Sequence, residues 1–484
     1  MAKSERSKKS KVLTSVAAVV LAVSMIIGGG TYAYLEAESD DVVNKFNTEQ
    51  VTVALDETGD KEYDIIPGTS EAKDPKVTVT NSVDAYVYVT VEDTTQGLVD
   101  YEIADGWLPL DGYENVYYRE VAAGEEPQEF YVLKDNKVSY DAALENKDME
   151  GKEDLKLTFK AYAIQKAPFN EPVAAWEGKD SVVATSQEEI TSAISENKPV
   201  VLAKDLTVSG NLAESVPENG SAVINLNNNT ITFDSTQGFE NGKSLEIENG
   251  TVVTPAGATN AFEIANDGDV TIKNTTVTSN VNNGNATFYI ADEGSTLNIV
   301  DSVVNQVGNG FIVSTNAEKE GIHRGVTINI KNSELNVSHT DGWSNVGVLL
   351  NVPGNLNIEN STITGEVAAV AVRGGTAVIK DSVLSRPYTV DGADETTRFM
   401  NSDWGTGNGL PISTLLIGNR STSYQYPSDV TLVNTDITAV SGKTVYMYGN
   451  TGEGLGATLT YDADCNIGTV LTGNDACTVN APTA

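Results

Sequence analysis

The stretch NLNIENSTITG, from Asn355 to Gly365, decides the fold because close variants of it recur along the chain. SLEIENGTVVT starts at Ser244, DVTIKNTTVTS at Asp269 and TLNIVDSVVNQ at Thr296. Each copy has two apolar residues separated by one position, then one variable position, Asn or Asp, a small residue, another variable position and a further apolar residue. Alternate residues of a strand point to opposite faces, so the apolar pair of each copy faces one shared interior.

The spacing of the copies predicts the architecture. The second apolar residue of each pair falls at Leu226, Ile247, Ile272, Ile299, Ile330, Ile358, Ile379 and Leu432, with a degenerate ninth copy at Leu459. The successive gaps are 21, 25, 27, 31, 28, 21 and 53 residues, and we interpret the last gap as two turns, the first without its motif. A second apolar strand lies between most copies, as in FEIA at Phe262 and VAVR at Val370. Repeats of this length with short strands predict a parallel β-solenoid.

The Asn or Asp of each copy predicts a ladder. Stacked coils align these residues, and we expect them to form an internal ladder of hydrogen-bonded side chains. A catalytic site needs unlike groups that converge at one place, so we interpret the ladder as structural. Its members are Asn228, Asn249, Asn274, Asp301, Asn332, Asn360, Asp381 and Asn434.

A helix is predicted to cover the first coil of the solenoid, whose edge is otherwise exposed. In SQEEITSAISEN, Ser186 and Glu189 have the spacing of a capping box. Ile190, Ala193 and Ile194 form an apolar stripe on the same helix. The preceding stretch, KAPFNEPVAAWEGKDS, has the composition of a linker.

The repeat resembles the right-handed β-helix of the pectate-lyase-like superfamily, over about residues 183 to 480. The resemblance implies clustered aspartates in its hydrolases, and calcium-binding carboxylates with an arginine base in its lyases. An Asn-Thr-Asp sequence occurs at Asn434, but it lies inside the ladder motif, and no Asp-Asp or Gly-His-Gly motif accompanies it on the solenoid. The arginines that remain as candidates for a lyase base are Arg373, Arg386 and Arg420. The alternative is that they are solvated surface charges.

The best candidate for a ligand-binding surface is the interruption SRPYTVDGADETTRFMNSDWGTGNGLP, which contains Tyr388, Phe399 and Trp404. RSTSYQYPSD adds Tyr424 and Tyr426. Insertions project from one face of a solenoid and often bind ligands, and aromatic residues beside Asp and Asn suit sugars. The alternative is a loop that folds down to cover an exposed strand.

A smaller loop, SHTDGWSN, contains Trp343 and His339, and we interpret His339 as a polar turn residue. The only other histidine is His323, and the chain has no zinc-binding motif. We therefore expect no metal and no other cofactor. The two cysteines, Cys465 and Cys477, are candidates for one disulfide, with two separate core residues as the alternative.

The N-terminus has the grammar of a signal peptide. The basic stretch KSERSKKSK precedes the apolar run VLTSVAAVVLAVSMII and then GGGTYAY. We predict cleavage after Ala33 and secretion, with membrane contact only through this transient segment. An uncleaved N-terminal anchor is the alternative.

The sequence that follows predicts a separate antiparallel β-sandwich. KVTVTN and AYVYVTVE alternate in the manner of strands. Together with EYDIIPGTSEAKDP and the closing strand LTFKAYAIQ, Leu157 to Gln165, they resemble the TasA/camelysin family of secreted Gram-positive proteins, over residues 20 to 176. The resemblance implies fibre formation, with Tyr34 to Leu55 as the donated strand. The alternative is an ordinary first strand of its own domain. One line of that family is known as metallopeptidases, but this sandwich contains no histidine.

These features predict an all-β protein with four parts: a signal peptide (1–33), an antiparallel β-sandwich (34–168), a linker (169–182) and a right-handed parallel β-helix with an N-terminal helical cap (183–484). The formal charge, 31 − 68 = −37, argues against nucleic acid and anionic membranes as partners. We expect a secreted bacterial surface or biofilm-matrix protein of structural or adhesive role, extracellular or attached to the cell surface, whose partners are itself and extracellular glycans. One alternative is a polysaccharide lyase or glycoside hydrolase. The other is a monomeric glycan-binding adhesin.

Overall fold

The computed structural model describes residues 51–58, 63–152, 155–169, 171–257, 259–290, 292–315, 325–340, 345–392, 411–418 and 425–482. The chain divides into two compact units, with the boundary between Lys179 and Asp180. Both are built of strands, as the sequence predicts. Among the described residues, no helix is long and apolar enough to span a membrane. The predicted signal peptide lies outside these residues.

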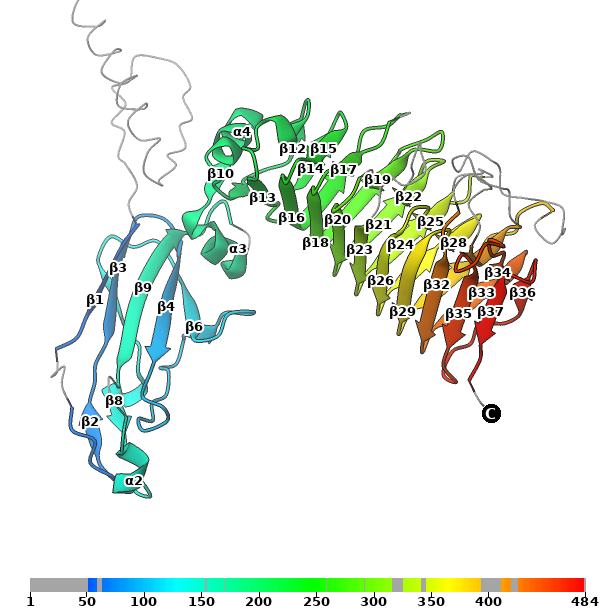
Figure 1. Ribbon diagram of the computed structural model, residues 1–484. Helices are drawn as coiled ribbons and strands as arrows, with labels where there is room; N and C mark the ends of the chain where they lie inside the picture. Colours follow the sequence, from blue (N-terminus) through cyan, green and yellow to red (C-terminus); the bar gives the residue numbers. More distant parts are fainter. Residues whose placement is uncertain are drawn as a thin grey trace, which may run out of the picture. The chain divides into compact units, whose positions relative to one another are not determined.

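The first unit is an antiparallel β-sandwich (Figure 1). One sheet has the order β1-β3-β7 and the other the order β5-β6-β4-β9. Val77 and Val79 of one sheet pack with Val87 and Val89 of the other in a shared core. The strands are β1 (Val51–Asp56), β3 (Lys76–Asn81), β4 (Ala85–Asp93), β5 (Leu108–Pro109), β6 (Val116–Val121), β7 (Gln128–Tyr131) and β9 (Leu157–Gln165), joined by a small β2 (Ser70–Ala72) and β8 (Lys137–Ser139) pair and by the short helices η1 (Lys134–Asn136) and α2 (Asn146–Met149).

Two sequence predictions about this unit can be compared with the structure. β9 has the bounds predicted for the closing strand. β1 pairs antiparallel with β3 along its whole length, from Val51 with Asn81 to Asp56 with Lys76. The described end of the proposed donor segment is therefore the first strand of its own sandwich, and the rest of that segment lies outside the described residues.

The predicted linker is largely part of the first unit. Residues 172–177 form helix α3 (Pro172–Glu177), followed by η2 (Gly178–Asp180). The Trp176 ring is only 8% exposed and packs against Tyr88, with 5.1 Å between ring centroids, and Tyr162, at 5.4 Å. Tyr88 Oη donates a hydrogen bond to the Pro172 carbonyl at 2.6 Å. The helix is therefore packed on the sandwich, not free between units.

The second unit is a parallel β-helix, whose strands lie side by side along its axis in Figure 1. Two long sheets form it. The 19-stranded sheet contains β10 (Val182–Ala184), β11 (Val200–Leu202), β12 (Leu206–Val208), β13 (Ser221–Asn225), β14 (Thr230–Phe233), β16 (Ser244–Val253), β18 (Asp269–Ser279), β20 (Thr296–Val300), β21 (Val303–Gln306), β23 (Val326–Lys331), β24 (Glu334–Val337), β26 (Gly354–Glu359), β27 (Thr362–Thr364), β29 (Gly375–Lys380), β30 (Val383–Arg386), β32 (Ser428–Val433), β33 (Asp436–Ala439), β35 (Ala457–Tyr461) and β37 (Cys477–Asn480).

The nine-stranded sheet contains the second apolar strand of each coil. Its members are β15 (Gln237–Glu240), β17 (Phe262–Ala265), β19 (Ala286–Ile290), β22 (Phe311–Thr315), β25 (Val346–Leu350), β28 (Ala368–Val372), β31 (Ser413–Ile417), β34 (Lys443–Met447) and β36 (Val470–Thr472). FEIA and VAVR, predicted as inner strands, fall on β17 and β28. The prediction of a second strand between motif copies is confirmed.

Inward-facing apolar residues of successive coils stack in register and form one continuous core. Ile247 is paired with Ile272, and Ile272 with Ile299. All three side chains are fully buried in the same cluster. Burial of one such side chain contributes about 1.5–3 kcal/mol, so repetition of the motif supplies the stability that no single coil has alone.

The interpretation of the 53-residue gap as two turns is wrong. β29 pairs directly with β32, and Ile379 is opposite Leu432. β28 likewise pairs with β31. The gap is one coil that has a long insertion between β30 and β31 and a shorter one between β31 and β32. The spacing of the motif copies gives the number of residues in the gap but does not show in which turn the extra residues lie.

The Asn/Asp ladder exists, but the prediction that it is internal is wrong. All eight residues have positive φ, from 44° at Asn274 to 62° at Asn228. Asn and Asp tolerate this backbone conformation better than most residues. Amide groups bond from coil to coil, for example Asn332 Nδ2 to Asp301 Oδ1 and Asn360 Nδ2 to Asn332 Oδ1, both at 2.9 Å. These side chains lie on the outer surface. The ladder is structural, as expected.

A second ladder, of hydroxyl groups, lies directly inside the first. From Thr275 onward, the residue after the turn Asn or Asp is buried. In four consecutive coils its backbone N–H donates to the side chain of the equivalent residue in the next coil. The links are Thr275 to Ser302, Ser302 to Ser333, Ser333 to Ser361 and Ser361 to Ser382, at 3.0–3.1 Å. This ladder gives the buried turn N–H groups their partners. The sequence pattern registered these residues only as small.

Cys465 takes the place of a hydroxyl in this second ladder. Its Sγ accepts a hydrogen bond from the Thr435 N–H at 3.4 Å. Cys465 and Cys477 are both free thiols, so the structure has the alternative of two separate residues, not the disulfide. Burial raises the pKa of both thiols.

The predicted cap of the solenoid is helix α4 (Gln187–Ser195). Ser186 Oγ accepts from the Glu189 N–H at 3.3 Å, and the Glu189 carboxylate accepts from the Thr185 N–H at 2.6 Å. Ile190, Ala193 and Ile194 are buried in the solenoid core. The helical cap is confirmed. Helix η3 (Leu212–Glu214) follows in an early coil.

Candidate ligand-binding site

Three successive turns at one edge of the β-helix gather polar and aromatic side chains. They are residues 338–345 between β24 and β25, residues 365–367 between β27 and β28, and residues 387–412 between β30 and β31. We call them the loop edge. β24, β27 and β30 are neighbours in one sheet and β25, β28 and β31 in the other. Parallel stacking therefore places the short middle turn between two longer ones.

Glu366, in the middle turn, is the buried centre of the loop edge. Its side chain is only 1% exposed. Oε2 accepts a hydrogen bond from the Thr340 N–H at 3.0 Å and another from the Asn345 amide. Oε1 lies 2.9 Å from His339 Nδ1. A carboxylate removed from water needs such partners, because a buried charge without them costs several kcal/mol.

His339 lies at the surface above this carboxylate. Its side chain is 41% exposed, and its ring stacks on Tyr388 with 5.1 Å between centroids and 14° between planes. Tyr388 is half-buried, and its hydroxyl donates to the Val337 carbonyl at 2.8 Å. The two rings thus form a small platform that is partly open to solvent and fixed from below.

Arg386, at the end of β30, joins the middle turn of the loop edge to the later turn between β33 and β34 from inside the protein. It is fully buried. Its Nε donates to the Glu366 carbonyl at 2.9 Å, and Nη1 donates to the Ser441 carbonyl. Arg373 is also buried, at 3% exposure. The interpretation of these two arginines as solvated surface charges is therefore wrong. The guanidinium of Arg386 donates hydrogen bonds to backbone carbonyls. The geometry at this residue therefore does not support the alternative that it is a lyase base. Arg420 lies outside the described residues.

The aromatic residues predicted to bind a ligand differ in their positions and exposure. Tyr388 belongs to the platform. Tyr426 is only 4% exposed, its ring lies against Gly374 and its carbonyl accepts from Asn450. It has no open face in this structure, and we withdraw it from the binding surface. Phe399, Trp404 and Tyr424 lie outside the described residues, as does Trp343.

The described ends of the long insertion cover a sheet face. Outward side chains of β22, β25, β28 and β31, among them Phe311, Leu349 and Leu416, form a second buried apolar cluster. Val390 and Ile412, from the two ends of the insertion, pack in the same cluster. The alternative of a loop that covers an exposed strand is therefore correct for these ends.

Sequence reasoning missed Glu366 and Asn345 and took His339 for an ordinary turn residue. One signal for Glu366 was available. It is a single carboxylate two positions before AAVAV, the wholly apolar strand that begins at Ala368, where a charge has no local reason to be. The partners of Glu366 were not readable, because they come from two other coils.

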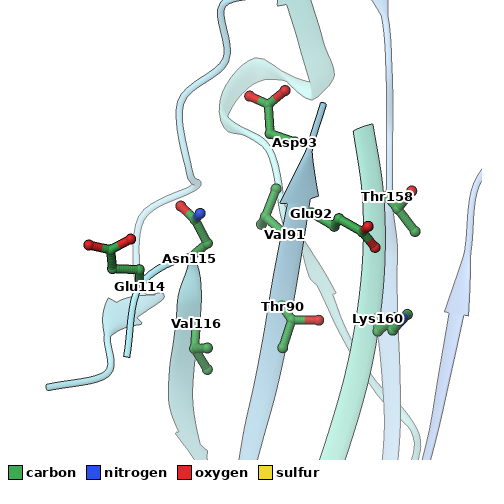
Figure 2. Close-up of a pocket in the computed structure, with 9 residues that line it drawn as sticks. All are labelled: Thr90, Val91, Glu92, Asp93, Glu114, Asn115, Val116, Thr158 and Lys160. Carbon is green, nitrogen blue, oxygen red and sulfur yellow. The ribbon is translucent and has the colours of Figure 1, made fainter. Parts of the chain in front are cut away.

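The remaining candidates on the described residues do not form a site. No group of three or more His, Cys, Asp or Glu is placed there to hold a metal. An open hollow of about 440 Å³ lies at the end of β4, β6 and β9 in the sandwich. Figure 2 shows Glu92 and Glu114 pointing to opposite sides of it. Asp93 is engaged by Thr95, whose N–H and hydroxyl both donate to it.

Comparison with known proteins shows no family for this chain. No family model matches the sequence, and no curated protein is similar to it, so the TasA/camelysin resemblance of the sandwich is not shown. Solved structures that match the chain include the catalytic domain of a GH87 α-1,3-glucanase in complex with nigerose, with 11% identity, a TM-score of 0.30 and coverage of 89% of this chain and 98% of that chain. The catalytic unit of a thermostable GH87 α-1,3-glucanase from Streptomyces thermodiastaticus has 13% identity, a TM-score of 0.24 and coverage of 88% and 98%. At these TM-scores the likeness supports no inference about the fold, the activity or the residues of this chain.

Proposed function

We propose that this chain is a secreted protein that binds extracellular glycans at the loop edge of its β-helix. The observation that carries the proposal is the platform of His339 and Tyr388, partly exposed and held from below by the buried Glu366 carboxylate. Ligand sites typically combine aromatic surface with a few fixed polar groups. A sugar ring offers the complement, with C–H faces for stacking and hydroxyl groups for hydrogen bonds.

Position and charge favour this assignment. The platform is formed by the two longer turns of the loop edge, because His339 belongs to 338–345 and Tyr388 to 387–412. Insertions in solenoids are common binding elements. The net charge of −37 disfavours nucleic acid and other polyanions. The sandwich then serves for attachment. We do not carry the fibre role forward, because the described part of the proposed donor segment is paired within its own sheet.

Glycan cleavage is the second candidate. It is favoured by one observation, the exposed imidazole oriented by a buried carboxylate, which is the arrangement of a general base. Hydrolysis of a glycoside uses two carboxyl groups about 5–9.5 Å apart, and Glu366 is the carboxyl group of the loop edge whose contacts the described residues show.

The test is a binding screen of the secreted chain, residues 34–484, against α-1,3-glucan, cellulose, chitin and pectin. We expect retention on at least one glycan, and at least a tenfold weaker affinity, about 1.4 kcal/mol, in His339→Ala and in Tyr388→Ala. Asn357→Ala, on an outward strand position with an exposed side chain, is the matched control and should bind normally.

Thermal unfolding of each variant separates loss of the site from loss of the fold. Binding that persists in both platform variants would move the site elsewhere. Failure to bind any glycan would overturn the proposal. Release of reducing ends or unsaturated products in the same screen, abolished by His339→Ala, would favour the cleavage alternative.

A further inference from the structure

The outward side chains of the first strand of each coil form rows along the β-helix. β20, β23, β26 and β29 pair in succession and lie side by side in Figure 1. Their outward positions alternate with core residues and are partly or fully exposed. The register of the strands gives one row of Thr296, Thr327, Asn355 and Thr376 and a second row of Asn298, Asn329, Asn357 and Val378. We call these eight residues the row face.

Hydrogen bonds between coils hold the amides of the row face in place. Asn329 Nδ2 donates to Asn298 Oδ1, and Asn357 Nδ2 donates to Asn329 Oδ1, both at 2.9 Å. Asn298 Nδ2 donates in turn to Thr271 Oγ1 at 3.1 Å. An amide has two N–H groups and two acceptor lone pairs, so these links use only half of the hydrogen-bonding capacity of Asn298 and Asn329. Side chains that are already ordered lose little entropy when they bind a partner.

The row face is uncharged, although the chain has a formal charge of −37. The outward positions of the six paired strands β18, β20, β23, β26, β29 and β32 include three lysines and three carboxylates, which cancel. They are Lys273, Lys331, Lys380, Asp269, Glu359 and Asp429. The chain as a whole repels a polyanion, and a polycation would bind more strongly to its acidic parts. The partner that this face fits is therefore uncharged.

The regular spacing of the rows favours a polymer over a small molecule. Neighbouring strands lie about 4.7–4.9 Å apart, and the row face offers hydroxyl, methyl or amide groups at every step. An extended polysaccharide repeats its own hydroxyl groups and C–H faces along its length, so one chain can contact several coils at once. Each contact after the first is intramolecular, and contacts that are weak singly then give firm binding together.

We propose, resting on the glycan-binding function above for the class of ligand, that the row face binds an extended, uncharged polysaccharide that lies along the axis of the β-helix. This surface shares no residue with the platform of His339 and Tyr388. A ligand that crosses several coils depends little on any one of them, so a single change such as Asn357→Ala should alter its affinity only slightly. The test therefore changes two neighbouring coils together.

Two matched pairs of Asn→Asp changes provide the comparison. Asn298→Asp with Asn329→Asp adds two charges to the row face. Asn305→Asp with Asn336→Asp adds two charges to the strands that follow in the same coils, β21 and β24, where Asn336 Nδ2 donates to Asn305 Oδ1 at 3.2 Å. Each pair loses an amide link between coils, and all four positions are half-buried. The effects of the two pairs on folding should therefore be similar.

Retention of the secreted chain, residues 34–484, on cellulose, chitin and α-1,3-glucan measures binding. We expect the row-face pair to bind about tenfold or more weakly than the parent chain to at least one of these neutral polymers, and the control pair to bind normally. Thermal unfolding shows whether each variant is folded. If the row-face Asp pair does not fold, Asn298→Ala with Asn329→Ala takes its place, and a smaller loss in the same direction is expected because no charge is added.

The outcomes separate this surface from the platform. Retention of the folded row-face pair at the level of the parent chain would overturn the inference, and weaker binding by His339→Ala would then leave the proposed function intact. Equal losses in both Asp pairs would also overturn it, because added charge anywhere on the solenoid would explain them. Loss in the row-face pair with normal retention of His339→Ala and Tyr388→Ala would support the inference and move the glycan site away from the platform.

Light scattering tests the other occupant, a second copy of this chain. A parent chain of twice the expected mass that becomes a single chain in the row-face pair would assign the face to self-association and overturn the inference. We expect instead the same mass for the parent chain and for both pairs.

Discussion

At the scale of the residue, each turn after the inward apolar pair combines two requirements. The Asn or Asp must adopt positive φ, as Asn332 does at 50°, and the next residue must give buried N–H groups an acceptor, as Ser333 does for Ser302. The first requirement was predictable, because few residues tolerate that conformation. The need for a hydrogen-bond acceptor was not predictable, because the motif identified the residue after the Asn or Asp only by its small size.

Asn332 allows these two properties of the ladder to be separated. Its amide donates to Asp301 and its oxygen accepts from Asn360. Asn332→Ala loses both bonds and places a Cβ at positive φ, so we expect a loss of about 1–2 kcal/mol in the free energy of unfolding. Asn332→Gly loses the bonds but keeps the conformation and should cost less. Urea unfolding measures both variants. A glycine variant as unstable as the alanine variant would mean that the amide bonds, not the backbone conformation, dominate.

At the scale of the element, strands were predictable and the connections between them were not. The alternation in FEIA and VAVR predicted β17 and β28 because inward residues repeat every second position. The candidate site was not predictable. His339, Glu366 and Tyr388 lie 27 and 22 residues apart in the sequence. They meet only because consecutive coils stack in register, and residue spacing does not reveal which turn holds an insertion.

The long insertion provides a test of that correction. β29 pairs directly with β32, and β28 pairs directly with β31. Replacing residues 393–410 by a short Gly-Ser link, with Val390 and Ile412 kept, should therefore leave a folded β-helix whose melting temperature falls only slightly. Circular dichroism during heating measures this. If the gap contained a missing coil, the change would remove part of the core and abolish cooperative unfolding. Weaker glycan binding by the shortened chain would place Phe399 or Trp404 at the ligand.

At the scale of the whole molecule, the two units have separate cores, and the boundary between them lies later than the sequence suggested. Composition alone made residues 169–182 a linker, because four of these fourteen residues are charged and the stretch also contains Pro172 and Gly178. The structure includes α3 in the first unit through Trp176, which packs on Tyr88 and Tyr162. Lys179 Nζ also lies 4.3 Å from the Trp176 ring centroid. A single buried aromatic residue is enough to convert a compositional linker into part of a domain.

This boundary predicts how fragments behave. Residues 34–179 should fold alone, with Trp107 buried in the sandwich core as a fluorescent reporter. Residues 34–168 lack α3 and leave Tyr88 without its cover, so we expect them to be less stable by about 3–5 kcal/mol, as a Trp→Ala change in a core is. Trp176→Ala in the longer fragment should reproduce most of that loss without shortening the chain. Residues 180–484 should unfold independently, because their core and α4 cap are complete. Urea unfolding measures the stability of the four proteins. Equal stability of the fragments 34–179 and 34–168 would mean that α3 is a linker and not part of the sandwich.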